Sequence, residues 1–144
     1  MNLLFIFLLA LFAGKNTASP PDNIEGTWLT AGDDAAKVSI YRTGNKYYGK
    51  IIWLEIPTEN GKPRMDEHNP DASKRNDPAI GMLIVKDFVW NEEEKHFDSG
   101  TVYDPKSGST YSGYMELVNE NKLKLRGFIV VSWIGRTEYW TRVK

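Results

Sequence analysis

The sequence predicts an all-β domain: an eight-stranded, antiparallel, up-and-down β-barrel with one long loop between its third and fourth strands. Short β-rich runs are separated at regular intervals by turn residues. Apolar and polar residues alternate along several of these runs, and no run of ten or more residues has a helical pattern. A barrel is favoured because closure removes unpaired sheet edges. A β-sandwich is the alternative.

The strands follow from the positions of the turns. The first three are expected at 26–29, 36–42 and 47–54, and residues 43–46 form a hairpin turn in which Gly or Asn supplies a positive φ. The other five are expected at 81–90, 97–103, 109–118, 122–131 and 136–143.

Alternation within the strands indicates one buried and one solvated face. In 122–129 and in 110–117, apolar or small residues alternate with polar ones. Glycine normally weakens a strand interior, so mid-strand glycines are expected to permit sharp coiling or close approach of strands. Four positions have this character: Gly49, Gly100, Gly113 and Gly127.

A polar segment between Leu54 and Gly81 interrupts the regular spacing. It holds four of the seven prolines and charges of both signs. Loops longer than ~12–15 residues are uncommon and are mostly functional lids or disordered linkers. We expect the 55–80 loop to be an ordered cover on the barrel, either a functional lid or a structural plug.

The N-terminal residues predict export. Residues 3–13 are all apolar, a run shorter than the ~20 residues of a membrane helix but typical of a secretory signal, and small residues follow at Ala18 and Ser19. A buried N-terminal helix is the alternative. We expect a signal peptide at 1–19, a single barrel domain at 20–144, no stable membrane insertion and a periplasmic location.

Composition and motifs narrow the chemistry. A formal net charge of −1 argues against nucleic acid, and the absence of cysteine excludes disulfides and thiol nucleophiles. The two histidines, His68 and His96, accompany no nucleophile motif. We expect Asp66, Asn69 and Asp71 to cap turns rather than bind metal, and His96 to be solvated. No catalytic group, metal or cofactor is expected.

Aromatic and arginine side chains are the candidate ligand contacts. Tryptophans on or beside the strands either fill the core or line a cavity, since an eight-stranded barrel can hold one small molecule. They are Trp28, Trp53, Trp90, Trp133 and Trp140. On the last strand, Arg136, Glu138, Trp140 and Arg142 share one face, and alternation does not decide whether that face points inward.

Two sets of motifs resemble known families. Gly26-Thr27-Trp28 and Thr141-Arg142-Val143 resemble the ends of the calycin barrels, the lipocalins and fatty-acid-binding proteins. That resemblance implies that Trp28 packs against Arg142 and seals one end of the barrel.

Seven ordered motifs resemble the exported bacterial family called domain of unknown function 2147. The resemblance implies a lipocalin-like envelope protein without an established activity. Its members often carry a cysteine pair in the second hairpin, where this chain has Thr43 and Tyr48, so hairpin packing must replace the bridge. The motifs are 40–42, 49–54, Asp66 with 69–71, 103–105, 110–113, 125–127, and 135–137 with 140–143.

The sequence thus predicts a monomeric exported barrel that binds a small apolar or weakly acidic ligand, or a lipid. Tryptophans would supply affinity, and an arginine would orient any carboxylate. The candidate residues are Trp28, Trp53, Arg126, Arg136, Trp140 and Arg142. The alternative is a non-enzymatic interaction protein that presents the 55–80 loop to an envelope partner; an enzyme is the least favoured class.

Overall fold

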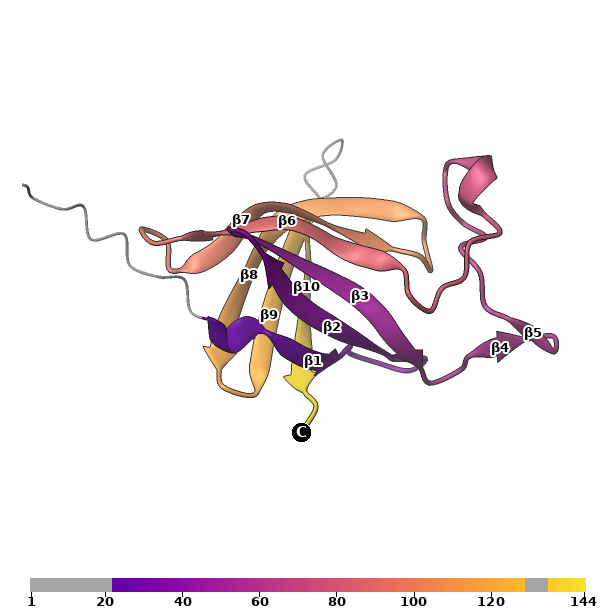
Figure 1. The fold of residues 1–144 in the computed structure, drawn as a ribbon, viewed down its shortest axis with the longest axis horizontal. Helices are drawn as coiled ribbons and strands as arrows, with labels where there is room; N and C mark the ends of the chain where they lie inside the picture. Colours follow the sequence, from indigo (N-terminus) through magenta and orange to yellow (C-terminus); the bar gives the residue numbers. More distant parts are fainter. Residues whose placement is uncertain (1–21, 129–134) are drawn as a thin grey trace, which may run out of the picture.

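A computed structural model describes residues 22–128 and 135–144, which form a closed antiparallel β-barrel (Figure 1). The predicted fold class is confirmed, and no sandwich is formed by this part of the chain. Its strands are β1 (Gly26–Leu29), β2 (Ala36–Thr43), β3 (Lys46–Leu54), β6 (Leu83–Asn91), β7 (His96–Asp104), β8 (Ser109–Asn119), β9 (Lys122–Phe128) and β10 (Gly135–Arg142).

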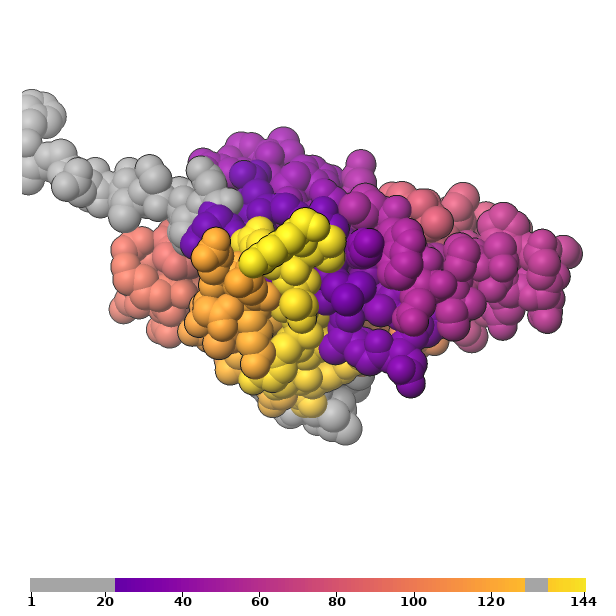
Figure 2. Space-filling view, turned by 90° about the horizontal axis from the view of Figure 1, so that it is seen from below, coloured from indigo at the N-terminus to yellow at the C-terminus, as the bar shows by residue number. Residues whose placement is uncertain are grey.

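The barrel closes where the first strand meets the last. The order around it is β1-β10-β9-β8-β7-β6-β3-β2. Trp28 is the register partner of Arg142, and Leu29 is the partner of Thr141. Figure 2 shows this seam as the yellow C-terminal strand lying against the indigo N-terminal segment.

Most predicted strand positions agree with the structure to within two residues. β6 begins at Leu83 rather than 81, and the predicted end of the seventh strand at 130–131 lies outside the described residues, as do Trp133 and the signal peptide. The hairpin turn between β2 and β3 contains Gly44 with a φ of 64°. This positive φ is the one expected from the turn sequence.

The long loop between β3 and β6 has secondary structure of its own. It contains the two-stranded hairpin β4 (Thr58–Glu59) and β5 (Lys62–Pro63), followed by the 3₁₀ turn η2 (Ala72–Lys74). In Figure 1 the hairpin and η2 project away from the barrel. Within the described residues, no helix has the length and apolar character needed to cross a membrane.

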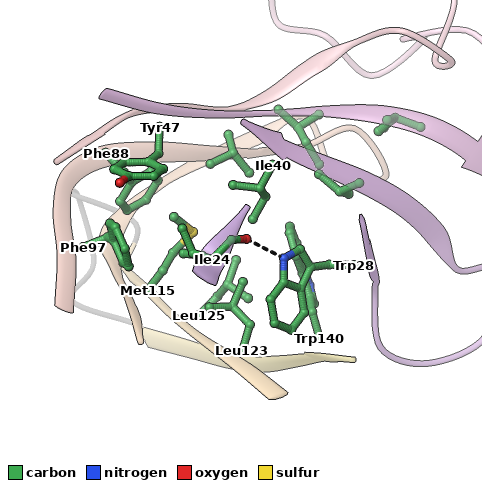
Figure 3. Packing of buried hydrophobic residues seen from close by; sticks show 14 residues of the cluster. Ile24, Trp28, Ile40, Tyr47, Phe88, Phe97, Met115, Leu123, Leu125 and Trp140 are labelled. Carbon is green, nitrogen blue, oxygen red and sulfur yellow. Dashed lines mark hydrogen bonds between the residues drawn. The ribbon is translucent and has the colours of Figure 1, made fainter. Parts of the chain in front are cut away.

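Large apolar side chains fill one end of the barrel (Figure 3). Tyr47 packs edge-on against Phe97, with ring centroids 4.8 Å apart. Fully buried neighbours from five further elements complete this core, and they include Ile24, Trp28, Phe88, Met115 and Leu123. We call this the closed end; it carries the hairpin turns at 44–45, 92–95 and 120–121.

The opposite, open end carries the connections at 30–35, 55–82 and 105–108. The four mid-strand glycines allow neighbouring atoms to approach closely, as expected. A Cβ added at any of the four would come within 1.8–2.9 Å of a neighbouring atom. At Gly113 that atom is the backbone oxygen of Arg126, which cannot easily move. The two ends therefore differ in what fills them.

Candidate functional site: a cavity at the open end of the barrel

Trp28 and Arg142 seal the closed end. Trp28 is fully buried, and its indole Nε1–H donates to the carbonyl of Ile24 at 2.9 Å (Figure 3). The Arg142 guanidinium lies over the indole, 4.3 Å from its centroid, which confirms the contact implied by the calycin resemblance. It also donates to the backbone carbonyls of Asn23, Glu25 and Glu120. Both side chains therefore have structural roles.

A cavity of about 410 Å³ lies at the open end. Two of its lining residues, Gly113 and Gly127, belong to a set of glycines at one level of three adjacent strands. Gly100 pairs with Gly113, Gly113 pairs with Gly127, and Gly127 pairs with Arg136. The glycines allow close packing at this level, because a Cβ at Gly113 or Gly127 would come within 1.8–2.8 Å of Arg126 or Tyr111.

The deeper wall of the cavity is apolar. Trp140, which is 3% exposed, both lines the cavity and belongs to the buried core of the closed end. Apolar side chains from five other strands complete this wall, namely Ala36, Ile51, Ile84, Phe88, Val102 and Leu125. This wall can bury apolar ligand surface, which stabilises a complex by ~25 cal/mol per Å² removed from water.

The polar wall is an ionic group centred on Arg136. The Arg136 guanidinium is 3.1 Å from the carboxylates of both Asp104 and Glu138. Glu138 Oε1 accepts the indole N–H of Trp140 at 2.9 Å. Burial opposes the charge on Arg136, but bonds to Tyr111 and the two carboxylates outweigh it and raise its pKa. Arg136 thus stays cationic and is already paired.

Residues 64–69, which we call the cover segment, cross the open end. Arg64 forms an ion pair with Asp34 of the β1–β2 loop at 2.8 Å. Asp66 accepts a 2.6 Å hydrogen bond from the hydroxyl of Tyr103 on β7. Arg64, Met65, Glu67 and His68 all line the cavity. The cover segment therefore lies over the cavity, whereas the hairpin and η2 of the same 55–80 loop project away from the barrel.

Asp66 anchors the cover segment. It is 3% exposed and also accepts a bond from the side-chain amide of Asn69 at 2.7 Å. Burial and the Asp66 carboxylate raise the pKa of Tyr103, which keeps its hydroxyl a donor. Asp71 caps η2 by accepting from the Ser73 backbone N–H at 3.0 Å, as expected. Asp66 bonds across the fold rather than capping a turn with its carboxylate.

The structure separates the six predicted ligand-contact residues. Arg136 and Trp140 line the cavity, and Arg126 lies at its edge with its guanidinium over Phe128 on the outer side. Trp28 and Arg142 form the closed end described above. Trp53 is 39% exposed on the outer surface under Lys37, because a register shift between β2 and β3 turns it outward.

Residues that the sequence did not suggest as ligand contacts complete the site. Tyr103, Asp104 and Tyr111 entered only as parts of a turn, of an alternating strand and of the family motifs. The mid-strand glycines were the available signal, since Gly113 and Gly127 line the cavity.

The two histidines lie in different surroundings, and each is near a carboxylate. The expectation that His96 is solvated is wrong: its side chain is 16% exposed, stacks on Tyr114 at 4.7 Å and lies 3.0 Å from Asp98. His68 is exposed beside Glu67 at the cavity edge. In the described part of the chain, His, Asp and Glu side chains form no group of three or more that could hold a metal ion.

Comparisons with known proteins agree with the fold. The family model described as "Uncharacterized protein conserved in bacteria (DUF2147)" matches residues 26–142. The chain is similar to the structure of protein HP1028 from Helicobacter pylori, described as belonging to the lipocalin family, with a TM-score of 0.70 and 19% identity over 83% of this chain and 82% of that one. No curated protein sequence matches. Both resemblances noted in the sequence are confirmed, and the barrel is lipocalin-like.

Proposed function

We propose that this chain, which belongs to the DUF2147 family of bacterial proteins, binds a small and predominantly apolar ligand in the open end of its barrel. The observation that carries the proposal is the cavity of about 410 Å³, whose deeper wall is apolar. Cavities of this size that combine an apolar wall with a few polar groups are typical of small-molecule sites.

An apolar ligand fits the cavity better than a weakly acidic one. A carboxylate needs a cationic partner in the cavity, and the arginines of the predicted set are occupied. Arg136 holds two carboxylates and Arg142 is fixed at the closed end. Arg126 points outward over Phe128. Affinity then depends mainly on buried apolar surface, with Trp140 as the largest contact.

Export to the periplasm is part of this proposal. It rests on the apolar run at 3–13 and the small residues that follow it. We also propose that the protein is a monomeric carrier rather than an enzyme. N-terminal sequencing of protein from the periplasmic fraction tests export, and an intact Met1 there would contradict it.

Binding is tested with purified protein that has been denatured, delipidated and refolded. N-phenyl-1-naphthylamine, a neutral apolar probe, should fluoresce on entering the cavity and should saturate at one site. Ala36→Phe places a ring in the cavity and should weaken binding at least tenfold, whereas Ala72→Phe, the same change on exposed η2, should not. Melting temperatures verify folding. No saturable signal, or equal effects of both variants, would overturn the proposal.

The interaction-protein alternative also has an observation in its favour. Large apolar side chains are exposed around the long loop: Ile52 at 48%, Ile56 at 48% and Ile80 at 50%. Such patches often mark interfaces. An Ile56→Ser, Ile80→Ser variant separates the two functions, since it should abolish capture of an envelope partner while leaving probe affinity unchanged.

A further inference from the structure

The polar wall of the cavity carries a surplus of negative charge. Arg136 supplies one positive charge, while Asp104 and Glu138, each within 3.1 Å of it, supply two negative charges. Two of the Arg136 donors are directed at these carboxylates. A carboxylate that approached Arg136 would therefore lie beside two negative charges.

Charges at the edge of the cavity do not reverse this surplus. Arg64 is neutralised by Asp34 at 2.8 Å. Lys106 donates to the backbone carbonyl of Asp34 at 2.8 Å, and exposed Glu67 at the same edge balances its charge. Arg126 also lies at the edge, but its guanidinium is on the outer side, over Phe128 and bonded to Thr137. The edge charges that face the cavity therefore balance.

Asp66 adds a second negative charge behind the wall. It is 3% exposed and is bonded to two neutral donors, the Tyr103 hydroxyl and the Asn69 amide. Within the described residues no salt bridge joins it to a base. A buried carboxylate without a counter-ion favours a cation nearby, because its field is weakly screened.

From this arrangement we infer that the cavity selects an amphiphile with a cationic polar end, such as a primary ammonium, and an apolar remainder. The inference rests on the proposed function and names its ligand class. The apolar part packs against Trp140, and the ammonium lies by Asp104 and Glu138, whose oxygens retain unused acceptor positions. A carboxylate on the same chain meets net repulsion at this position.

The selectivity should be measurable with three probes that share one chain. Decylammonium, decanol and decanoate each have ten carbons and differ at the polar end, which at pH 7 is cationic, neutral and anionic respectively. Each is used below its micelle-forming concentration to displace N-phenyl-1-naphthylamine. One surplus charge at a partly exposed site predicts about tenfold tighter binding of decylammonium than of decanoate, with decanol between them.

Matched variants test whether the polar wall of the cavity causes this selectivity. Asp104→Asn with Glu138→Gln removes both charges while keeping acceptor oxygens, and it should bring decanoate to at least the affinity of decylammonium. Glu116→Gln is the control, because Glu116 pairs with Lys124 on the outer side of β8 and β9 and does not line the cavity. It removes one negative charge from the outer surface and should leave the order of affinities unaltered.

The outcomes separate this inference from the proposed function. Tightest binding of decylammonium, lost in the double variant and kept in Glu116→Gln, supports it. Tightest binding of decanoate or decanol, or a similar shift in the control, overturns the inference and leaves the binding function intact. Binding of the fluorescent probe without any displacement also overturns it, whereas failure of the fluorescent probe itself to bind overturns the proposed function.

Discussion

The inward face of β10 has different roles at the two ends of the barrel. On β10, Arg142, Trp140, Glu138 and Arg136 all point inward, with Arg142 at the closed end and Arg136 at the open end. Arg142 is held by an indole and by backbone carbonyls, whereas Arg136, whose side chain is 52% exposed, is held by carboxylates beside a hollow. The same residue type thus seals the barrel at one end and lines a cavity at the other.

The largest expected effect is a loss of stability from a substitution at the closed end. Trp28→Ala removes a fully buried indole and should lower the free energy of unfolding by about 3–5 kcal/mol. Trp53→Ala is the matched control on the outer surface and should cost less than about 1 kcal/mol. Urea denaturation measures the loss of unfolding free energy in both variants. Similar losses would mean that Trp28 does not stabilise the closed end.

At the open end, Tyr103→Phe tests the anchor of the cover segment. It leaves the buried Asp66 carboxylate without a 2.6 Å hydrogen bond, and bonds to charged groups contribute about 1.5–3 kcal/mol. Tyr139→Phe, on the exposed outer side of β10, should have little effect. Equal melting temperatures for wild type and Tyr103→Phe would show that the cover segment is not held there.

Two arginine variants sharpen the comparison directly. Arg142→Ala removes a cation–π contact and packing on Trp28 and should cost about 1–2 kcal/mol. Arg136→Ala removes half-exposed ion pairs and should cost less than about 1 kcal/mol. Thermal unfolding of both variants compares the two losses of stability. A larger loss for Arg136→Ala would contradict the structural role of Arg142.

The smallest effect concerns acid stability near the β6–β7 hairpin. Burial opposes ionisation of Asp98, but hydrogen bonds from Asn91, His96 and Ser99 outweigh it and lower its pKa. A lowered pKa stabilises the fold above the unfolded value, and this contribution disappears as pH falls through the folded value. Asp98→Asn should therefore lose less stability between pH 7 and pH 3 than wild type does.

The control for this prediction is Glu93→Gln, which removes an exposed charge from the same hairpin. It should keep the acid sensitivity of the wild type. If Asp98→Asn shows the same fall in melting temperature between pH 7 and pH 3 as wild type, the bonds to Asp98 contribute nothing to stability.

Local patterns predicted the barrel because alternation and turn residues act within a few positions of each other. The strands from 36 to 54 show this, as does the turn at Gly44. The Trp28–Arg142 contact followed from a resemblance, since the two residues are joined only by closure of the barrel. Alternation and turn residues do not predict the register between strands that are far apart in the sequence.

Register explains what the sequence left open or missed. Trp53 points outward because the β2–β3 register shifts beside Lys37. The Asp66–Tyr103 bond joins residues 37 positions apart, and nothing local to either predicts it. Register also brings Gly100, Gly113 and Gly127 to one level of three strands, and Gly113 and Gly127 line the cavity there.

The central claim, that a ligand enters the open end while the closed end is sealed, is tested most directly by NMR. Amide shifts of ¹⁵N-labelled protein are followed during titration with N-phenyl-1-naphthylamine. We expect large changes at Ala36, Val102 and Gly113, which line the cavity, and none at Asn23 and Asn121 of the closed end. Changes centred on the closed end, or on the outer surface near Trp53, would contradict it.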